Sequence, residues 1–157
     1  NELKTYLFVT LFVAGNIILP QICHLFPDGG KIFLPIYFFT LLASYKYGFK
    51  VGLMTAIFSP LINSLLFGMP AIALLPAILM KSVVLAIAAA FVANKTHKIS
   101  IVNLLVVVFA YQFVGTLFEW AMTSSFYIAI QDFRLGITGM ILQILLTYIL
   151  LSIPSKE

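Results

Sequence analysis

Two ionisable side chains fall inside long apolar runs of the chain. Lys81 is near the middle of the run 71–92, and Glu119 is toward the end of the run 101–122. If these runs cross a membrane, a charge near the bilayer centre costs at least about 2.5–3.5 kcal/mol, so such groups normally face a cavity or a partner. Two interpretations follow: either both groups contact a polar ligand, or Lys81 and Glu119 pair with each other.

Three apolar runs also carry small or polar residues at helical spacing. The members of each set are three or four positions apart, which places each set on one helix face. Interhelical hydrogen bonds, at about 0.6 kcal/mol each on average, explain such faces; a pocket with a few convergent polar groups explains them equally well. The sets are Thr55, Ser59 and Asn63; Gln112, Thr116, Glu119 and Thr123; and Gly136, Gly139, Gln143 and Thr147.

The pocket interpretation predicts a substrate site that opens toward the end of the molecule near Glu119 and Thr123. Trp120 adjoins Glu119, and we expect its ring to stack on a ligand. The predicted walls are Asn63, Lys81, Gln112, Thr116, Glu119, Trp120 and Gln143.

Catalytic and metal-binding motifs are missing from the sequence. It contains no nucleophile–base arrangement, phosphate-binding loop or metal-ligand spacing. Cys23 and His24 form the one pair of soft-metal ligands, and one pair cannot close a zinc site. We therefore expect no enzyme activity, no cofactor and no resident metal. A small intramembrane enzyme using Glu119 or Lys81 stays open as an alternative.

The elements that position these residues are membrane spans. The 157 residues are 62% hydrophobic and 9% charged, against about 25% charged residues in a soluble domain. At about 20 apolar residues per span, one domain over residues 1–157 forms an all-α integral membrane bundle of six helices. We expect Pro60 to interrupt the third span, and the first to be retained rather than cleaved as a signal peptide. The expected spans are 6–22, 32–45, 51–67, 71–92, 101–122 and 136–153.

The basic residues predict the orientation. If the N-terminus is cytoplasmic, the two outer basic residues are Lys31 and Arg134, Lys81 lies within a span, and the positive-inside rule is satisfied with both termini in the cytoplasm. The net charge of +4 therefore reports orientation, because no basic stripe or nucleic-acid motif accompanies it. The expected inner residues are Lys4, Lys46, Lys50, Lys95, Lys98 and Lys156.

The loop after the first span holds the chain's one Pro-Asp-Gly-Gly cluster, a strong turn signal. Its glycines permit hinge motion, so we expect it to close over the pocket as a lid. The lid residues are Cys23, His24, Asp28, Gly29 and Gly30.

The layout resembles the S components of energy-coupling-factor (ECF) transporters, the subunits that bind a vitamin or its precursor. The resemblance rests on the outer loop, the Gly68-Met69-Pro70 turn and the stretch from Leu34-Pro35-Ile36-Tyr37 to Ser59-Pro60-Leu61-Ile62-Asn63. It implies uptake across a bacterial or archaeal cytoplasmic membrane. It also implies that the subunit topples onto a transmembrane coupling subunit driven by two ATPases, unless it works alone.

Small residues on the first helix dock the coupling subunit in S components, which implies that role for Thr10, Ala14 and Gly15. The usual Ala-x-x-x-Ala stands here as Thr10-x-x-x-Ala14. Some S components bind cobalamin, and Cys23 and His24 favour a cobalamin-like ligand. The sequence also resembles the rod-shape-determining MreD proteins, which are membrane scaffolds. Their usual acidic residue after a Gly-Leu pair is missing beyond Gly52-Leu53. A scaffold is expected to be packed solid, and a substrate binder to contain an outward cavity.

Overall fold

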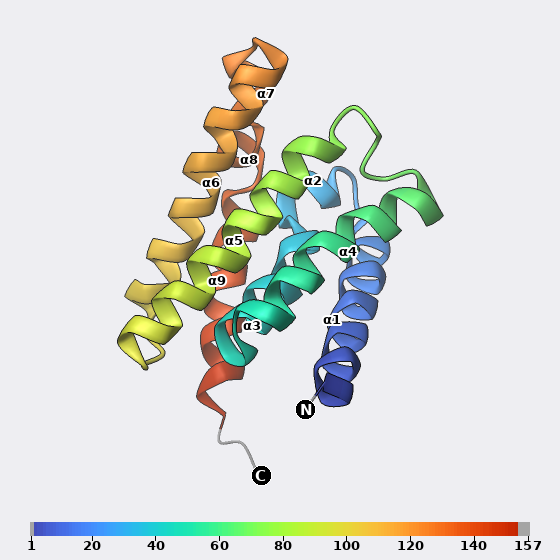
Figure 1. Cartoon of the computed structure of the whole chain (residues 1–157). Coiled ribbons are helices and arrows are strands. Elements are labelled where there is room, and N and C mark those ends of the chain that lie inside the picture. The colour runs from blue at the N-terminus through green and yellow to red at the C-terminus, as the bar shows by residue number, and fades with distance from the viewer. Residues whose placement is uncertain (1, 154–157) are drawn as a thin grey trace.

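The structure is a computed structural model that describes residues 2–153, and within that range every regular element is helical (Figure 1). Its elements are α1 (Glu2–Cys23), α2 (Gly29–Phe33), the 3₁₀ turn η1 (Pro35–Tyr37), α3 (Phe38–Tyr47), α4 (Phe49–Phe67), α5 (Leu75–Thr96), α6 (Ile101–Thr123), α7 (Phe126–Ala129), α8 (Gln131–Leu135) and α9 (Ile137–Ser152). The long helices alternate in direction, so that α1 begins and α9 ends at one end of the bundle, opposite α2, α7 and α8. Lys156, expected on the cytoplasmic side, lies outside the described residues.

Four helices of the described chain, α1, α4, α5 and α6, are long and apolar enough to cross a membrane. A fifth helix, α9, is apolar but has only 16 residues. At 1.5 Å per residue, 16 residues extend about 24 Å, against a hydrocarbon core of about 30 Å. By length and composition, the chain is a multi-pass α-helical membrane protein.

The expected span 32–45 is broken. Leu34 adopts φ 47° and ψ 51° between α2 and η1, and the following Pro35 disfavours the right-handed helical conformation that would continue α2. This left-handed conformation is costly for a residue with a side chain. A hydrogen bond from Gln143 Nε2 on α9 to the Leu34 carbonyl, 3.1 Å long, holds the break. What remains of the span is α3, with 10 residues.

The expectation that Pro60 interrupts the third span is wrong. Helix α4 continues through it from Phe49 to Phe67. Proline lacks an N–H group, so Pro60 leaves the Ala56 carbonyl without its helical donor. The Ser82 hydroxyl on α5 donates to that carbonyl at 2.9 Å, so a neighbouring helix supplies the missing bond.

A second proline is accommodated in the same way. Pro20 lies inside α1 and leaves the Asn16 carbonyl free, and Asn63 Nδ2 on α4 donates to it at 3.0 Å. The Asn16 side chain is fully buried, and its Nδ2 donates to Thr40 on α3 at 3.1 Å and to Ser59 on α4 at 2.9 Å. These bonds join α1, α3 and α4 at the level where the site lies.

Candidate functional site

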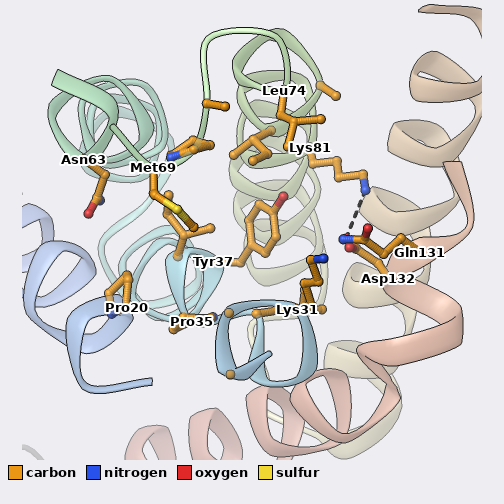
Figure 2. Close-up of a pocket in the computed structure, with 18 of the residues that line it drawn as sticks. Pro20, Lys31, Pro35, Tyr37, Asn63, Met69, Leu74, Lys81, Gln131 and Asp132 are labelled. Carbon is orange, nitrogen blue, oxygen red and sulfur yellow. Dashed lines mark hydrogen bonds and ion pairs between the residues drawn. The ribbon is translucent and has the colours of Figure 1, made fainter. Parts of the chain in front are cut away.

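A cavity of about 620 Å³ opens at the end of the bundle that carries α2, α7 and α8 (Figure 2). Its wall is mostly apolar, with a few polar and charged groups on more than one side (Figure 2). Polar and charged groups come from His24, Asp28, Lys31, Tyr37, Asn63, Lys81, Glu119, Gln131 and Asp132. The main apolar groups are Pro20, Phe26, Leu34, Pro35, Ile36, Met69, Pro70, Leu74, Ile78 and Ile128.

The buried charged groups of the wall form an ion triad. Lys81 Nζ on α5 lies 3.0 Å from Glu119 Oε1 on α6 and 3.0 Å from Asp132 Oδ2 on α8. All three residues are more than nine-tenths buried, with exposures of 3%, 8% and 7%. Buried charges persist only when paired and hydrogen-bonded. Of the two interpretations left open by the sequence, the structure contains the Lys81–Glu119 pair, and Asp132 joins it at the cavity wall.

Gly115 makes the reach of Lys81 possible. The lysine stem crosses α6 directly over this glycine, and a Cβ at position 115 would collide with Lys81 Cγ and lie 3.0 Å from Cε. Close helix approach in membranes generally relies on such small residues. Gly115 therefore lets the ammonium group reach Glu119 and the loop beyond α6.

The opposite side of the cavity presents hydrogen-bonding groups that are only partly used. Asn63 is 1% exposed; its Nδ2 donates to Asn16 and Ser59, while its Oδ1 has no partner. Tyr37 rises from η1 between α2 and α5, and Lys31 extends from α2 toward the cavity (Figure 2). The Tyr37 ring packs against Tyr111 with centroids 5.2 Å apart.

The structure brings most lid residues and part of the predicted wall together. From the predicted wall, Asn63, Lys81 and Glu119 line the cavity. From the predicted lid, His24, Asp28, Gly29 and Gly30 line it, whereas Cys23 does not.

Gln143 has a structural position instead of one on the cavity wall. It is 2% exposed, accepts from the Tyr111 hydroxyl at 2.9 Å and donates to the Leu34 carbonyl. Its amide therefore anchors the broken segment that forms the cavity floor.

The remaining predicted wall residues lie away from the cavity. Gln112 and Thr116 are buried on α6, and their side-chain polar atoms have no hydrogen-bond partner. Trp120 is 45% exposed, and its ring meets the edge of Phe126 with centroids 4.8 Å apart. The expected stacking of Trp120 on a ligand would require it to leave this contact.

The small residues of α1 divide between two faces. Thr10 and Ala14 line an apolar groove of about 500 Å³ between α1 and α4, together with residues such as Val13, Met54 and Phe58. Gly15 faces the interior, where a Cβ would lie 2.8 Å from the Phe39 ring. The groove therefore includes Thr10 and Ala14 but not Gly15, because positions 14 and 15 point about 100° apart on a helix.

Sequence reasoning missed Asp132, Tyr37, Lys31 and Gly115 as site residues. Asp132 falls between the expected spans 101–122 and 136–153, and only the fold of α7 and α8 returns it toward Lys81. Gly115 carried a usable signal, since a glycine inside an apolar helix lowers stability unless packing requires it. No family model matches the chain, and neither a search of curated proteins nor one of solved structures finds a match.

Within residues 2–153, no group of three or more His, Cys, Asp or Glu side chains is arranged to hold a metal ion. The Lys81 ammonium occupies the space between the two buried carboxylates. What the arrangement can do chemically is to bind: it combines an apolar enclosure with a few fixed polar groups.

Proposed function

We propose that this chain is the substrate-binding S component of an energy-coupling-factor transporter and takes up a micronutrient. The observation that carries the proposal is the cavity of about 620 Å³ lined in part by the segment between α1 and α3. A membrane scaffold would be expected to be packed solid, so an open and mostly apolar cavity of this size favours a binder. The ion triad at the wall gives that cavity specific chemistry.

The size of the cavity favours a compact ligand. Pockets for drug-sized molecules measure about 300–1,000 Å³, and 620 Å³ suits a micronutrient with one or two rings. A corrinoid with its nucleotide arm is much larger than a drug-sized molecule. We therefore propose a ring-containing vitamin or precursor in place of a cobalamin-like ligand, although His24 lines the cavity.

The proposal includes six crossings and cytoplasmic termini. In this proposal the four long helices, the shorter α9 and the combined α2–η1–α3 segment make the six crossings. The cavity then opens outward, on the side away from Lys46, Lys50, Lys95 and Lys98. This assignment follows the positive-inside rule in the cytoplasmic membrane of a bacterium or archaeon. Thr10 and Ala14 would contact the coupling subunit that two ATPases drive.

Native mass spectrometry of the purified protein tests the proposal. A small molecule that co-purifies at one copy per chain is the expected result. The Glu119→Gln variant, which removes one charge from the ion triad at the cavity wall, should retain less of that molecule. A chain that carries no molecule, and that gains no thermal stability from a library of water-soluble vitamins, would overturn the binding function.

A further inference from the structure

The charges around the cavity do not balance. Its lining includes the cations Lys31 and Lys81 and the carboxylates Asp28, Glu119 and Asp132, which leaves one negative charge in excess while His24 is neutral. The chain as a whole carries a net charge of +4, so the cavity has the opposite sign. The local excess therefore requires an explanation within the cavity itself.

The excess resides in the buried triad. Asp28 and Lys31 are exposed lid residues of opposite charge, whereas Lys81 must neutralise two buried carboxylates alone. Lys81 contacts Glu119 Oε1 and Asp132 Oδ2; within residues 2–153 the second oxygen of each carboxylate accepts no hydrogen bond, and neither is among the buried polar atoms without a partner, so both can be reached from the cavity. An excess negative charge at a mostly apolar wall favours a ligand that brings a positive charge to it.

Across the cavity, the unused polar atom is again an acceptor. Asn63 Oδ1 is buried and has no donor, although the same amide uses its Nδ2 twice. A buried polar atom without a partner costs about 1–3 kcal/mol. Free oxygens on both sides of an apolar enclosure therefore call for a ligand that supplies hydrogen-bond donors.

We infer that the ligand is a singly charged organic cation with at least one N–H donor and an apolar ring body. The positive group lies against the free oxygens of Glu119 and Asp132, and the N–H donor or another donor on the ring reaches Asn63 Oδ1. This inference rests on the proposed function, since it names the ligand class of the same cavity. The competing account is that a proton on one carboxylate cancels the excess charge, which leaves a cavity without preference for cations.

Three probes with one indole body and one ethylene linker separate these accounts: tryptamine is a cation, tryptophol is neutral and indole-3-propionate is an anion. Their dissociation constants are measured by calorimetric titration on the whole chain in lipid nanodiscs. Tryptamine should bind about 10-fold or more tightly than tryptophol, as expected for a hydrogen bond to a charged group, and indole-3-propionate should bind most weakly. In Asp132→Asn, the affinity for tryptamine should fall about 10-fold while that for tryptophol changes less than about 2-fold.

The matched control is Glu2→Gln, which removes a carboxylate from the exposed start of α1 and should leave the order of the probes unchanged. If Asp132→Asn fails to fold, Glu119→Gln replaces it. If tryptophol or indole-3-propionate bound as tightly as tryptamine, the cation inference would be overturned, whereas the proposed binding function would stand. If no probe binds, the charge of the molecule that co-purifies decides: a cation supports the inference, and a neutral or anionic molecule overturns it. If nothing co-purifies either, the proposed function and the inference fail together.

Discussion

The Ser82 hydroxyl on α5 donates a 2.9 Å hydrogen bond to the Ala56 carbonyl on α4, the group that Pro60 deprives of its helical donor. Ser82→Ala should therefore lower the free energy of unfolding by about 1 kcal/mol, within the range for a buried carbonyl left without a donor. Pro60→Ala restores an N–H group at that turn, so Ser82→Ala should cost less than half as much in that background. Thermal unfolding of the four proteins of this double-mutant cycle checks the coupling. If Ser82→Ala lowered the free energy of unfolding equally with Pro60 and with Pro60→Ala, the hydrogen bond would not compensate for the proline.

The ion triad predicts that removing its one positive charge destabilises the protein more than removing all three charges. Lys81→Met leaves Glu119 and Asp132 buried without a cation, and should destabilise the protein by about 3–5 kcal/mol, as measured when one partner of a buried ion pair is removed. Combining Lys81→Met with Glu119→Gln and Asp132→Asn removes every charge and should recover most of that loss. The thermal midpoints of both variants provide the measurement. A single mutant as stable as the parent would show that the two carboxylates are not both ionised in the folded protein.

Glu119→Gln separates a ligand contact from a structural pair. Lys81 keeps Asp132 as its partner in this variant, so the protein should stay folded. If Glu119 bonds the ligand, affinity should fall by about 1.5–3 kcal/mol, roughly a 10- to 150-fold weaker dissociation constant. Titration with the co-purifying ligand and a thermal melt on the same sample give both quantities, and Glu2→Gln serves as the control. Lost stability with unchanged affinity would return Glu119 to a structural role.

Gly115→Ala should disturb the site without touching a charged group. The added methyl collides with the Lys81 stem and forces the ammonium group away from Glu119 and Asp132. We expect a loss of about 1–3 kcal/mol of stability, typical of overpacking, together with weaker ligand binding. Ala110→Gly on the same helix lacks this contact and should cost only about the 1 kcal/mol of helix propensity. Thermal melts and ligand titrations of both variants make the comparison; an unchanged affinity in Gly115→Ala would mean that the position of Lys81 is not needed for binding.

The orientation can be tested by thiol labelling at the lid. Position 29 is unsuitable, because a Cβ there would collide with the Cys23 carbonyl oxygen, whereas Asp28 is exposed. In a Cys23→Ser background, Asp28→Cys should react with an impermeant maleimide in intact cells. Lys98→Cys, at the opposite end of the bundle, should react only after permeabilisation. If Lys98→Cys reacted in intact cells and Asp28→Cys reacted only after permeabilisation, both termini would lie outside.

The groove between α1 and α4 predicts a coupling defect separate from binding. Ala14→Trp fills the groove that Thr10 and Ala14 line, and should abolish transport while ligand affinity stays within about 2-fold. Leu11→Trp adds the same bulk at an exposed position of α1 outside the groove and should transport normally. Uptake of radiolabelled ligand into cells with the complete transporter gives the answer. Normal transport by Ala14→Trp would remove this groove from the coupling interface.

Apolar runs were sufficient to predict an all-helical membrane protein, because each long helix coincides with one continuous, mostly apolar run of the sequence. They were not sufficient for the span containing Leu34, where the backbone conformation depends on Pro35 beside it and on Gln143 at a distance of 109 positions. The Lys81–Glu119 contact was foreseeable because two isolated charges in apolar helices need partners. Asp132 was not, since its neighbours gave no sign that a short loop folds back into the bundle.

The Gln143–Leu34 bond also bears on how the protein is made. Leu34 leaves the ribosome more than a hundred residues before Gln143, so the left-handed break exists without its stabilising amide through most of translation. The floor of the cavity is therefore finished only when the final helix has entered the membrane. A ribosome that stalls before α9 would release a chain with four long hydrophobic helices and no completed binding site. This part of the cavity therefore depends on α9, which supplies the amide that holds Leu34 in place.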